Sequence, residues 1–151
     1  EWMREAEKAV PLVSNQVPYS MITRGIEKEV VPYCIENNKS ILAYSPMERG
    51  LLTGKITPGY RFEEGDHRAT HPSFTPENIQ RTNAMLEKMK PLAIEKGITL
   101  SQLVLRWTVQ RPGITIALAG ARNASQALQN AKAGEFALTQ EEMEFINTLL
   151  I

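Results

Sequence analysis

Segments with helical periodicity alternate with short apolar runs along this chain. This alternation is the sequence feature that most limits the possible folds. Three runs stand out: PLVSNQVPYS (11–20), SILAYSPM (40–47) and ITIALAG (114–120). Each run is short, apolar and bounded by polar or glycine-containing turns, as buried parallel strands are. Because a helical segment precedes each run, the sequence predicts an α/β architecture with a parallel sheet.

Helices are predicted from apolar periodicity and from residues that cap helix ends. In chain order, the predicted helical ranges are 1–9, 25–38, 75–97, 99–113, 123–133 and 139–150. Thr99 or Ser101 is expected to cap its helix, and Thr139 with the acid three residues on forms a capping box. Pro91 is expected to bend or break the helix that contains it. Residues 48–74 form a long loop of the kind that is functional or disordered.

Length and composition limit the classes of protein. The 151 residues suffice for one domain with a core, but a complete (β/α)8 barrel needs roughly 250. The formal net charge is zero, with 17 basic and 17 acidic side chains, so we expect no binding to nucleic acid or to an anionic membrane. Cys34 is the only cysteine, which excludes an intrachain disulfide and predicts a small buried hydrophobe. With no apolar stretch near membrane-span length, we expect a cytoplasmic protein.

The segment GARNASQALQN, residues 120–130, follows the third apolar run directly. A strand that runs through a glycine into a helix start offers free backbone N–H groups and a positive dipole, and Arg122 adds a bidentate cation. Gln126, Gln129 and Asn130 recur at helical spacing, so they share one face of the helix. That face is either solvated surface or part of a ligand site, and the glycine and arginine favour a phosphate ligand.

The segment AYSPMERGLLTGK, residues 43–55, leaves the second predicted strand and enters the long loop. Ser45 and Pro46 cannot continue a strand ladder, so the chain turns at the carboxyl end of a strand, where ligands of α/β proteins bind. Lys55 has two open interpretations: a solvated lysine, or a second cation that reaches a pyrophosphate or a 2′-phosphate.

Two other polar groups fit a structural role as well as a functional one. Asn15 and Gln16 interrupt the first predicted strand, where alternation puts them on opposite faces. A core hydrogen-bond network accounts for them as well as a ligand amide does. Asp66, His67 and His71 lie close together in a predicted loop, but spacing supplies no third metal ligand, so we predict no metal site.

The motifs NQVPYS, LAYSPMERGLLTGK, DHR, LVLRW and GARNASQALQN occur in the order and spacing of the aldo-keto reductases, and the chain resembles that family over almost its whole length. The resemblance implies a (β/α)8 barrel of the TIM type that binds NADPH and transfers hydride to aldehydes or ketones. It identifies residues 1–151 as the C-terminal part of such a barrel, a single domain fragment with the sixth, seventh and eighth strands.

Carried over position by position, the resemblance implies a cofactor site. Its residues are Gln16, Tyr44, Ser45, Pro46, Met47, Gly50, Lys55, Gly120, Arg122, Gln126, Gln129 and Asn130. Gln16 would bond the nicotinamide carboxamide and Tyr44 would stack on the ring. Ser45, Pro46, Met47 and Gly50 would line the pyrophosphate, with Lys55 reaching toward it. Gly120 and Arg122 would hold the adenosine 2′-phosphate, with the three amides of 126–130 around the adenosine. Gln129 stands where the family often has Glu.

The resemblance also implies what this chain lacks. The family's proton-transfer tetrad of Asp, Tyr, Lys and His lies upstream of these motifs, so we expect the chain alone to be an inactive fragment of a longer reductase. Two alternatives remain: a non-catalytic nucleotide-binding module or half-barrel subunit, and a remnant without activity. Three strands of a barrel leave open edges and an uncovered apolar face, so we expect self-association.

Overall fold

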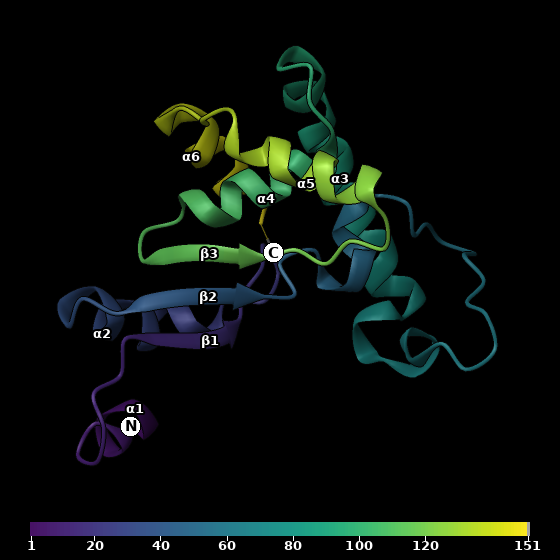
Figure 1. Ribbon diagram of the computed structural model, residues 1–151. Helices are drawn as coiled ribbons and strands as arrows, with labels where there is room; N and C mark the ends of the chain where they lie inside the picture. Colours follow the sequence, from purple (N-terminus) through teal and green to yellow (C-terminus); the bar gives the residue numbers. More distant parts are fainter. Residues whose placement is uncertain (151) are drawn as a thin grey trace.

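The computed structural model describes residues 1–150 and contains one sheet of three parallel strands in the order β1-β2-β3. The strands are β1 (Ser14–Pro18), β2 (Ser40–Tyr44) and β3 (Ile114–Leu118). The three predicted parallel strands are therefore confirmed. Figure 1 shows the three arrows side by side and pointing the same way, so their carboxyl ends lie at one edge of the sheet.

Helices and short 3-10 turns connect and cover the strands. The α-helices are α1 (Trp2–Ala6), α2 (Val30–Glu36), α3 (Pro76–Glu95), α4 (Leu100–Gln110), α5 (Ala124–Ala131) and α6 (Gln140–Leu149). The 3-10 turns are η1 (Gly25–Glu27), η2 (Glu48–Thr53), η3 (His67–Thr70), η4 (Pro72–Phe74) and η5 (Lys132–Gly134). Figure 1 shows α3 to α6 gathered on the β3 side of the sheet, with α1 apart beyond β1.

One face of the sheet packs against helices and forms the main core. Ile41 and Ala43 of β2 have no exposed surface and contribute to a cluster with Cys34 of α2 and Trp107 of α4. The burial predicted for Cys34 is confirmed, and it raises the pKa of the thiol. Alternation then directs the intervening residues of each strand to the opposite face.

That opposite face is apolar and uncovered within residues 1–150. The register pairs Leu42 with Ile116 and Tyr44 with Leu118, so these side chains share one face. Ile116 is 46% exposed, Tyr44 41% and Leu118 37%. Gln16 pairs with Leu42 on the same face, whereas Asn15 points to the helix side and donates to Met3 Sδ at 3.1 Å. The prediction that Asn15 and Gln16 lie on opposite faces is confirmed.

Three helix predictions need correction or adjustment. The first predicted helix is shorter than 1–9, because α1 ends at Ala6 and buries none of its residues. The second is split into η1 and α2, because Pro32 has no N–H to bond within a continuous helix but fits the first turn of one. Of the bend or break expected at Pro91, the break does not occur: α3 continues to Glu95, with Met89 and Ala93 buried in the core on either side.

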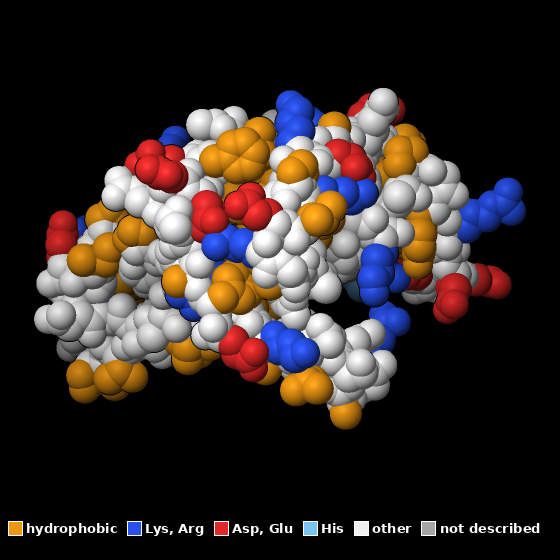
Figure 2. Space-filling view, turned by 90° about the horizontal axis from the view of Figure 1, so that it is seen from above, with side chains coloured by type: hydrophobic (Ala, Val, Ile, Leu, Met, Phe, Trp, Pro, Cys, Tyr) orange, Lys and Arg blue, Asp and Glu red, His pale blue; other side chains and the backbone are white. Residues whose placement is uncertain are grey.

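The outer surface carries mixed charge. Figure 2, which looks down on the molecule from above, shows acidic, basic and hydrophobic side chains interspersed across this face. This pattern agrees with the zero formal net charge. No helix in the described part of the chain is long and apolar enough to cross a membrane.

Candidate functional site

The carboxyl ends of β2 and β3 bring two of the predicted motifs to the same edge of the sheet. Tyr44 pairs with Leu118, and Tyr19 at the end of β1 donates its N–H to Tyr44 O at 3.2 Å. The turns that begin at Ser45 and at Ala119 therefore leave neighbouring strands side by side (Figure 1). In barrels this edge carries the ligand-binding loops.

The turn after β2 has an unusual backbone. Four of its residues have positive φ angles: Ser45 (55°), Glu48 (45°), Arg49 (50°) and Gly50 (96°). Side chains other than glycine disfavour this left-handed region, so the three non-glycine residues cost conformational energy that the surrounding structure must offset. Strained backbone of this kind concentrates at binding sites.

Contacts from distant segments hold this turn. Ser20 at the end of β1 donates its hydroxyl to Glu48 Oε1 at 2.6 Å, and both side chains are buried. Arg68 donates from Nη1 to Arg49 O at 3.2 Å. Gly50 and Leu52 both donate their N–H groups to Met47 O. Neither Ser20 nor Glu48 was predicted from the sequence, although a Glu inside a Gly- and Pro-containing turn is a usable signal.

The turn after β3 is held by the polar residues of α5. Asn123 caps α5 and accepts from Gln126 N at 2.9 Å, while Gln126 Oε1 accepts from Arg122 N at 2.8 Å. Asn130 donates from Nδ2 to Gly120 O at 3.2 Å. These hydrogen bonds involve the backbone atoms of residues 120 and 122. They do not involve the Arg122 side chain, which is exposed to solvent. The first N–H groups of α5 have no partner within the helix.

Gln129 turns away from this loop and joins α5 to α4. The Gln102 side chain of α4 donates to Gln129 O at 3.1 Å and to Gln129 Oε1 at 3.0 Å. Gln102 also closes the capping box with Thr99, which confirms Thr99 as the cap of α4. Since α4 also contacts η2, it fixes the turn after β2 and helix α5 relative to one another.

The remaining predicted site residues lie around this edge. Pro46 is buried, Met47 packs against the main core, and Lys55 is exposed just after η2. Gln16 lies on the open sheet face two residues before the end of β1. The structure thus brings ten of the twelve predicted residues to the end of β2, to the turns after β2 and β3 or to α5, with Lys55 just after η2 and Gln16 further down the sheet face.

Asp66 and Arg68 form the main ion pair of the long loop. Arg68 Nε lies 3.0 Å and Nη2 2.5 Å from Asp66 Oδ2, and the Arg68 backbone N–H bonds Oδ1. These bonds lower the pKa of the Asp66 carboxyl to about 2. His71 accepts from Ser73 N, and its Nε2 lies 2.8 Å from Arg49 Nη1. In residues 1–150 no three His, Cys, Asp or Glu side chains cluster as metal ligands would.

The ion pair gives a pH prediction. Because the folded-state pKa of Asp66 lies below its ordinary value of 3.8, its stabilising effect is present above about pH 4 and is lost as the pH falls through about 2. In Arg68→Gln we expect the Asp66 midpoint to rise toward 3.8, measured by carboxyl NMR titration. Arg49→Gln is the control and should leave the midpoint low. An unchanged midpoint in Arg68→Gln would refute the pair.

Comparison with known proteins gives a consistent picture. The model of the Aldo/keto reductase family matches residues 1–151. Aldo-keto reductase YhdN of Bacillus subtilis is 34% identical over 151 residues, which cover 99% of this chain and 46% of YhdN. The uncharacterized oxidoreductase Rv2298 of Mycobacterium tuberculosis is 32% identical over 143 residues, or 93% of this chain and 43% of that protein.

A solved structure agrees as well. The glycerol dehydrogenase AKR11B4 from Gluconobacter oxydans superposes with a TM-score of 0.90 at 31% sequence identity, covering 98% of this chain and 45% of that one. The chain therefore spans less than half the length of the relatives it matches.

Proposed function

We propose, because this chain belongs to the aldo/keto reductase family of barrel-fold oxidoreductases, that its residues hold NADPH in a reductase of aldehydes or ketones. The family generally uses NADP(H). Because the chain spans less than half the length of these relatives, the activity of the whole protein is part of this proposal.

The observation that carries the proposal is the pair of turns at the ends of β2 and β3. One turn has strained backbone fixed by Ser20 and Arg68, and the other leads into the capped start of α5. Preorganised backbone N–H groups and a helix start suit phosphate groups, which cannot be recognised by apolar contacts. A dinucleotide has two such groups to satisfy, and NADPH has a third.

Each part of the cofactor has a partner of suitable chemistry. Tyr44 exposes its ring at the end of β2 and is suited to stack on the nicotinamide, while Gln16 on the same face can bond its carboxamide. The turn from Ser45 to Gly50, with Lys55, suits the pyrophosphate. Arg122 suits the 2′-phosphate, and the amides of α5 suit the adenosine.

Bound NADPH supplies the hydride, and the protein's part is to orient it. Reduction of a carbonyl also needs a proton donor near neutral pH. Tyr19 is unsuited to that role, because burial and its hydrogen bond to Glu27 raise its pKa. We propose that the donor is not among residues 1–151.

The proposal is tested by titrating the purified protein with NADPH, following nicotinamide fluorescence, and assaying carbonyl reduction in the same samples. We expect saturable binding. Tyr44→Ala should weaken it by roughly three- to tenfold, the value of one aromatic stacking contact. Phe145→Ala is the matched control, because Phe145 on α6 is 43% exposed. No saturable binding would refute the proposal. Binding without turnover is the result expected of residues 1–151 alone, and turnover would contradict the proposal that the proton donor lies outside them.

We propose further that the exposed face of Tyr44, Ile116 and Leu118 drives self-association. Apolar side chains at 37–46% exposure on three adjacent positions form a surface that favours burial. In sedimentation velocity we expect concentration-dependent association that Ile116→Ser weakens. Ile94→Ser is the control, because Ile94 is 76% exposed on α3, away from this face. A monomer at all concentrations would contradict the proposal.

A further inference from the structure

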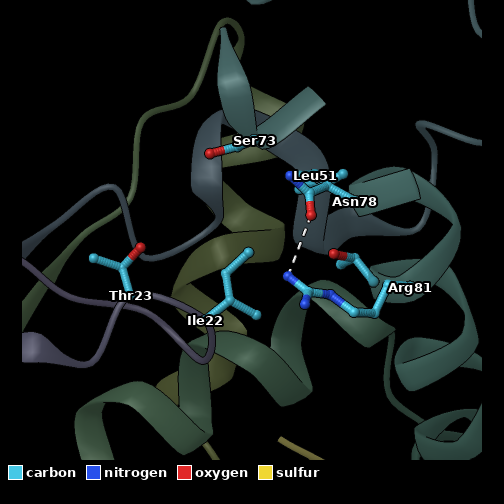
Figure 3. A pocket seen from close by; sticks show the side chains of 7 residues that line it. Ile22, Thr23, Leu51, Ser73, Asn78 and Arg81 are labelled. Carbon is cyan, nitrogen blue, oxygen red and sulfur yellow. Dashed lines mark hydrogen bonds between the residues drawn. The ribbon is translucent and has the colours of Figure 1, made fainter. Parts of the chain in front are cut away.

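A polar pocket lies beside η2 and is lined by residues other than those of the candidate cofactor site. It is lined by the segment after β1, by η2, by η4 and by the first turns of α3. Its volume is about 140 Å³, and its lining residues are Ile22, Thr23, Leu51, Ser73, Asn78, Arg81 and Thr82. Figure 3 shows these side chains arranged around a common space.

The pocket contains hydroxyl groups that no other protein group satisfies. Thr82 is 3% exposed, and its hydroxyl has no hydrogen-bond partner among residues 1–150. No side-chain oxygen in this part of the chain is both fully shielded and unbonded. The Thr82 hydroxyl therefore faces the pocket that it lines. The Thr23 and Ser73 side chains are partly exposed and line the same pocket, so their hydroxyls are also open to a ligand there.

The charge of the pocket is positive. Arg81 uses only Nη2, which donates to Asn78 Oδ1 at 3.2 Å, so its other N–H groups remain available (Figure 3). No carboxylate is among the lining residues. Asn78, Arg81 and Thr82 belong to the first two turns of α3, where the helix dipole adds positive potential. Leu51 and Ile22 close the pocket on its apolar side.

The size of the pocket limits its ligand. A cavity of about 150 Å³ holds a molecule the size of benzene. A phosphate or sulfate ion fits such a space, whereas a nucleotide does not. Guanidinium N–H groups and several hydroxyl donors match the oxygens of a tetrahedral anion. We infer that this pocket binds a small tetrahedral oxyanion, with Arg81 and Thr82 as its principal donors.

The test is calorimetric titration of the purified protein with sodium phosphate at constant ionic strength, in the wild type and four variants. We expect saturable binding that depends on Arg81 and Thr82. Arg81→Gln should weaken phosphate binding by about tenfold or more, because it removes charge-assisted hydrogen bonds. Thr82→Val keeps the shape of the side chain and should weaken binding about threefold or more through loss of one neutral bond.

Two control variants distinguish binding in this pocket from a general effect of charge and from binding at the turn after β3. Lys88→Gln removes the same charge from an exposed position on α3 that does not line the pocket, and it should leave phosphate affinity within about twofold because water and salt screen the charge. In Arg122→Ala, the phosphate binding that depends on Arg81 should remain. The inference fails if the wild type shows no saturable binding, or if Lys88→Gln weakens binding as much as Arg81→Gln. It also fails if only Arg122→Ala weakens binding, which would locate phosphate at the turn after β3.

Discussion

Trp107→Ala is expected to lower the free energy of unfolding by about 3–5 kcal/mol, the range for truncating a buried large aromatic side chain. Trp107 has no exposed surface. Its ring stacks on Tyr19 with centroids 6.0 Å apart and planes inclined by 14°, and Arg111 lies over it with Cζ 5.3 Å from the centroid. Its Nε1 donates to Asn147 Oδ1 at 3.0 Å. The substitution would therefore leave a cavity and an unpaired amide.

Because of its position, replacing Trp107 is expected to destabilise the whole fold. Through its partners it joins the end of β1, helix α4 and helix α6, three elements that the sequence separates widely. Tyr19 is fixed in turn by its hydrogen bonds to Glu27 at 2.5 Å and from Arg111 at 3.2 Å. Since domains of this size are stable by only about 5–15 kcal/mol, the expected loss is a large fraction of the total.

The measurement is equilibrium unfolding in urea, with the midpoint and slope compared between variants. Trp107→Phe keeps most of the ring and loses the bond to Asn147, so it should cost about 1–2 kcal/mol. Trp2→Ala removes the other tryptophan, which is 86% exposed, and should change stability by about 0.5 kcal/mol or less. Equal costs for Trp107→Ala and Trp2→Ala would contradict the central packing role of Trp107.

The sequence predicted the strands and helix caps, because these elements depend on residues that lie close together in the chain. The runs around Gln16, Leu42 and Ile116 are strands because buried parallel strands are short and apolar on both faces. Thr139 caps α6 in the predicted capping box with Glu142. The error in the first helix also has a local origin. Periodicity predicted a helix over 1–9, but α1 has only five residues, because none of its side chains is buried and little tertiary contact stabilises a longer helix.

The candidate site was predictable only in part, for a different reason. The turns themselves follow from Ser45 with Pro46, and from Gly120 ahead of a capped helix. The groups that fix those turns do not, because the bonds join residues far apart in the chain: Ser20 to Glu48, and Gln102 to Gln129. Helical or strand periodicity carries no information on such pairs. Periodicity likewise could not predict the backbone strain at Glu48 and Arg49, since neither residue type favours a positive φ.

Arg122→Ala is expected to raise the dissociation constant for NADPH by about 10- to 100-fold, the value of one or two hydrogen bonds to a charged group. The constant for NADH, which has no 2′-phosphate, should stay nearly unchanged, so the preference between the two would fall by the same factor. The substitution should not disturb the turn, because Gln126 bonds the backbone N–H of residue 122 rather than its side chain.

The measurement is fluorescence titration with both nucleotides at two salt concentrations. The contribution of an exposed cation is screened by salt, so the difference between wild type and Arg122→Ala should shrink as salt increases. Arg122→Lys should fall between the two, because an ammonium keeps the charge but lacks the planar pair of donors. Lys132→Ala removes a cation from the other end of α5 and should leave the preference intact. An unchanged preference in Arg122→Ala would exclude this residue from the proposed 2′-phosphate site, and any preference for NADPH would then have to come from Lys55 or from residues elsewhere.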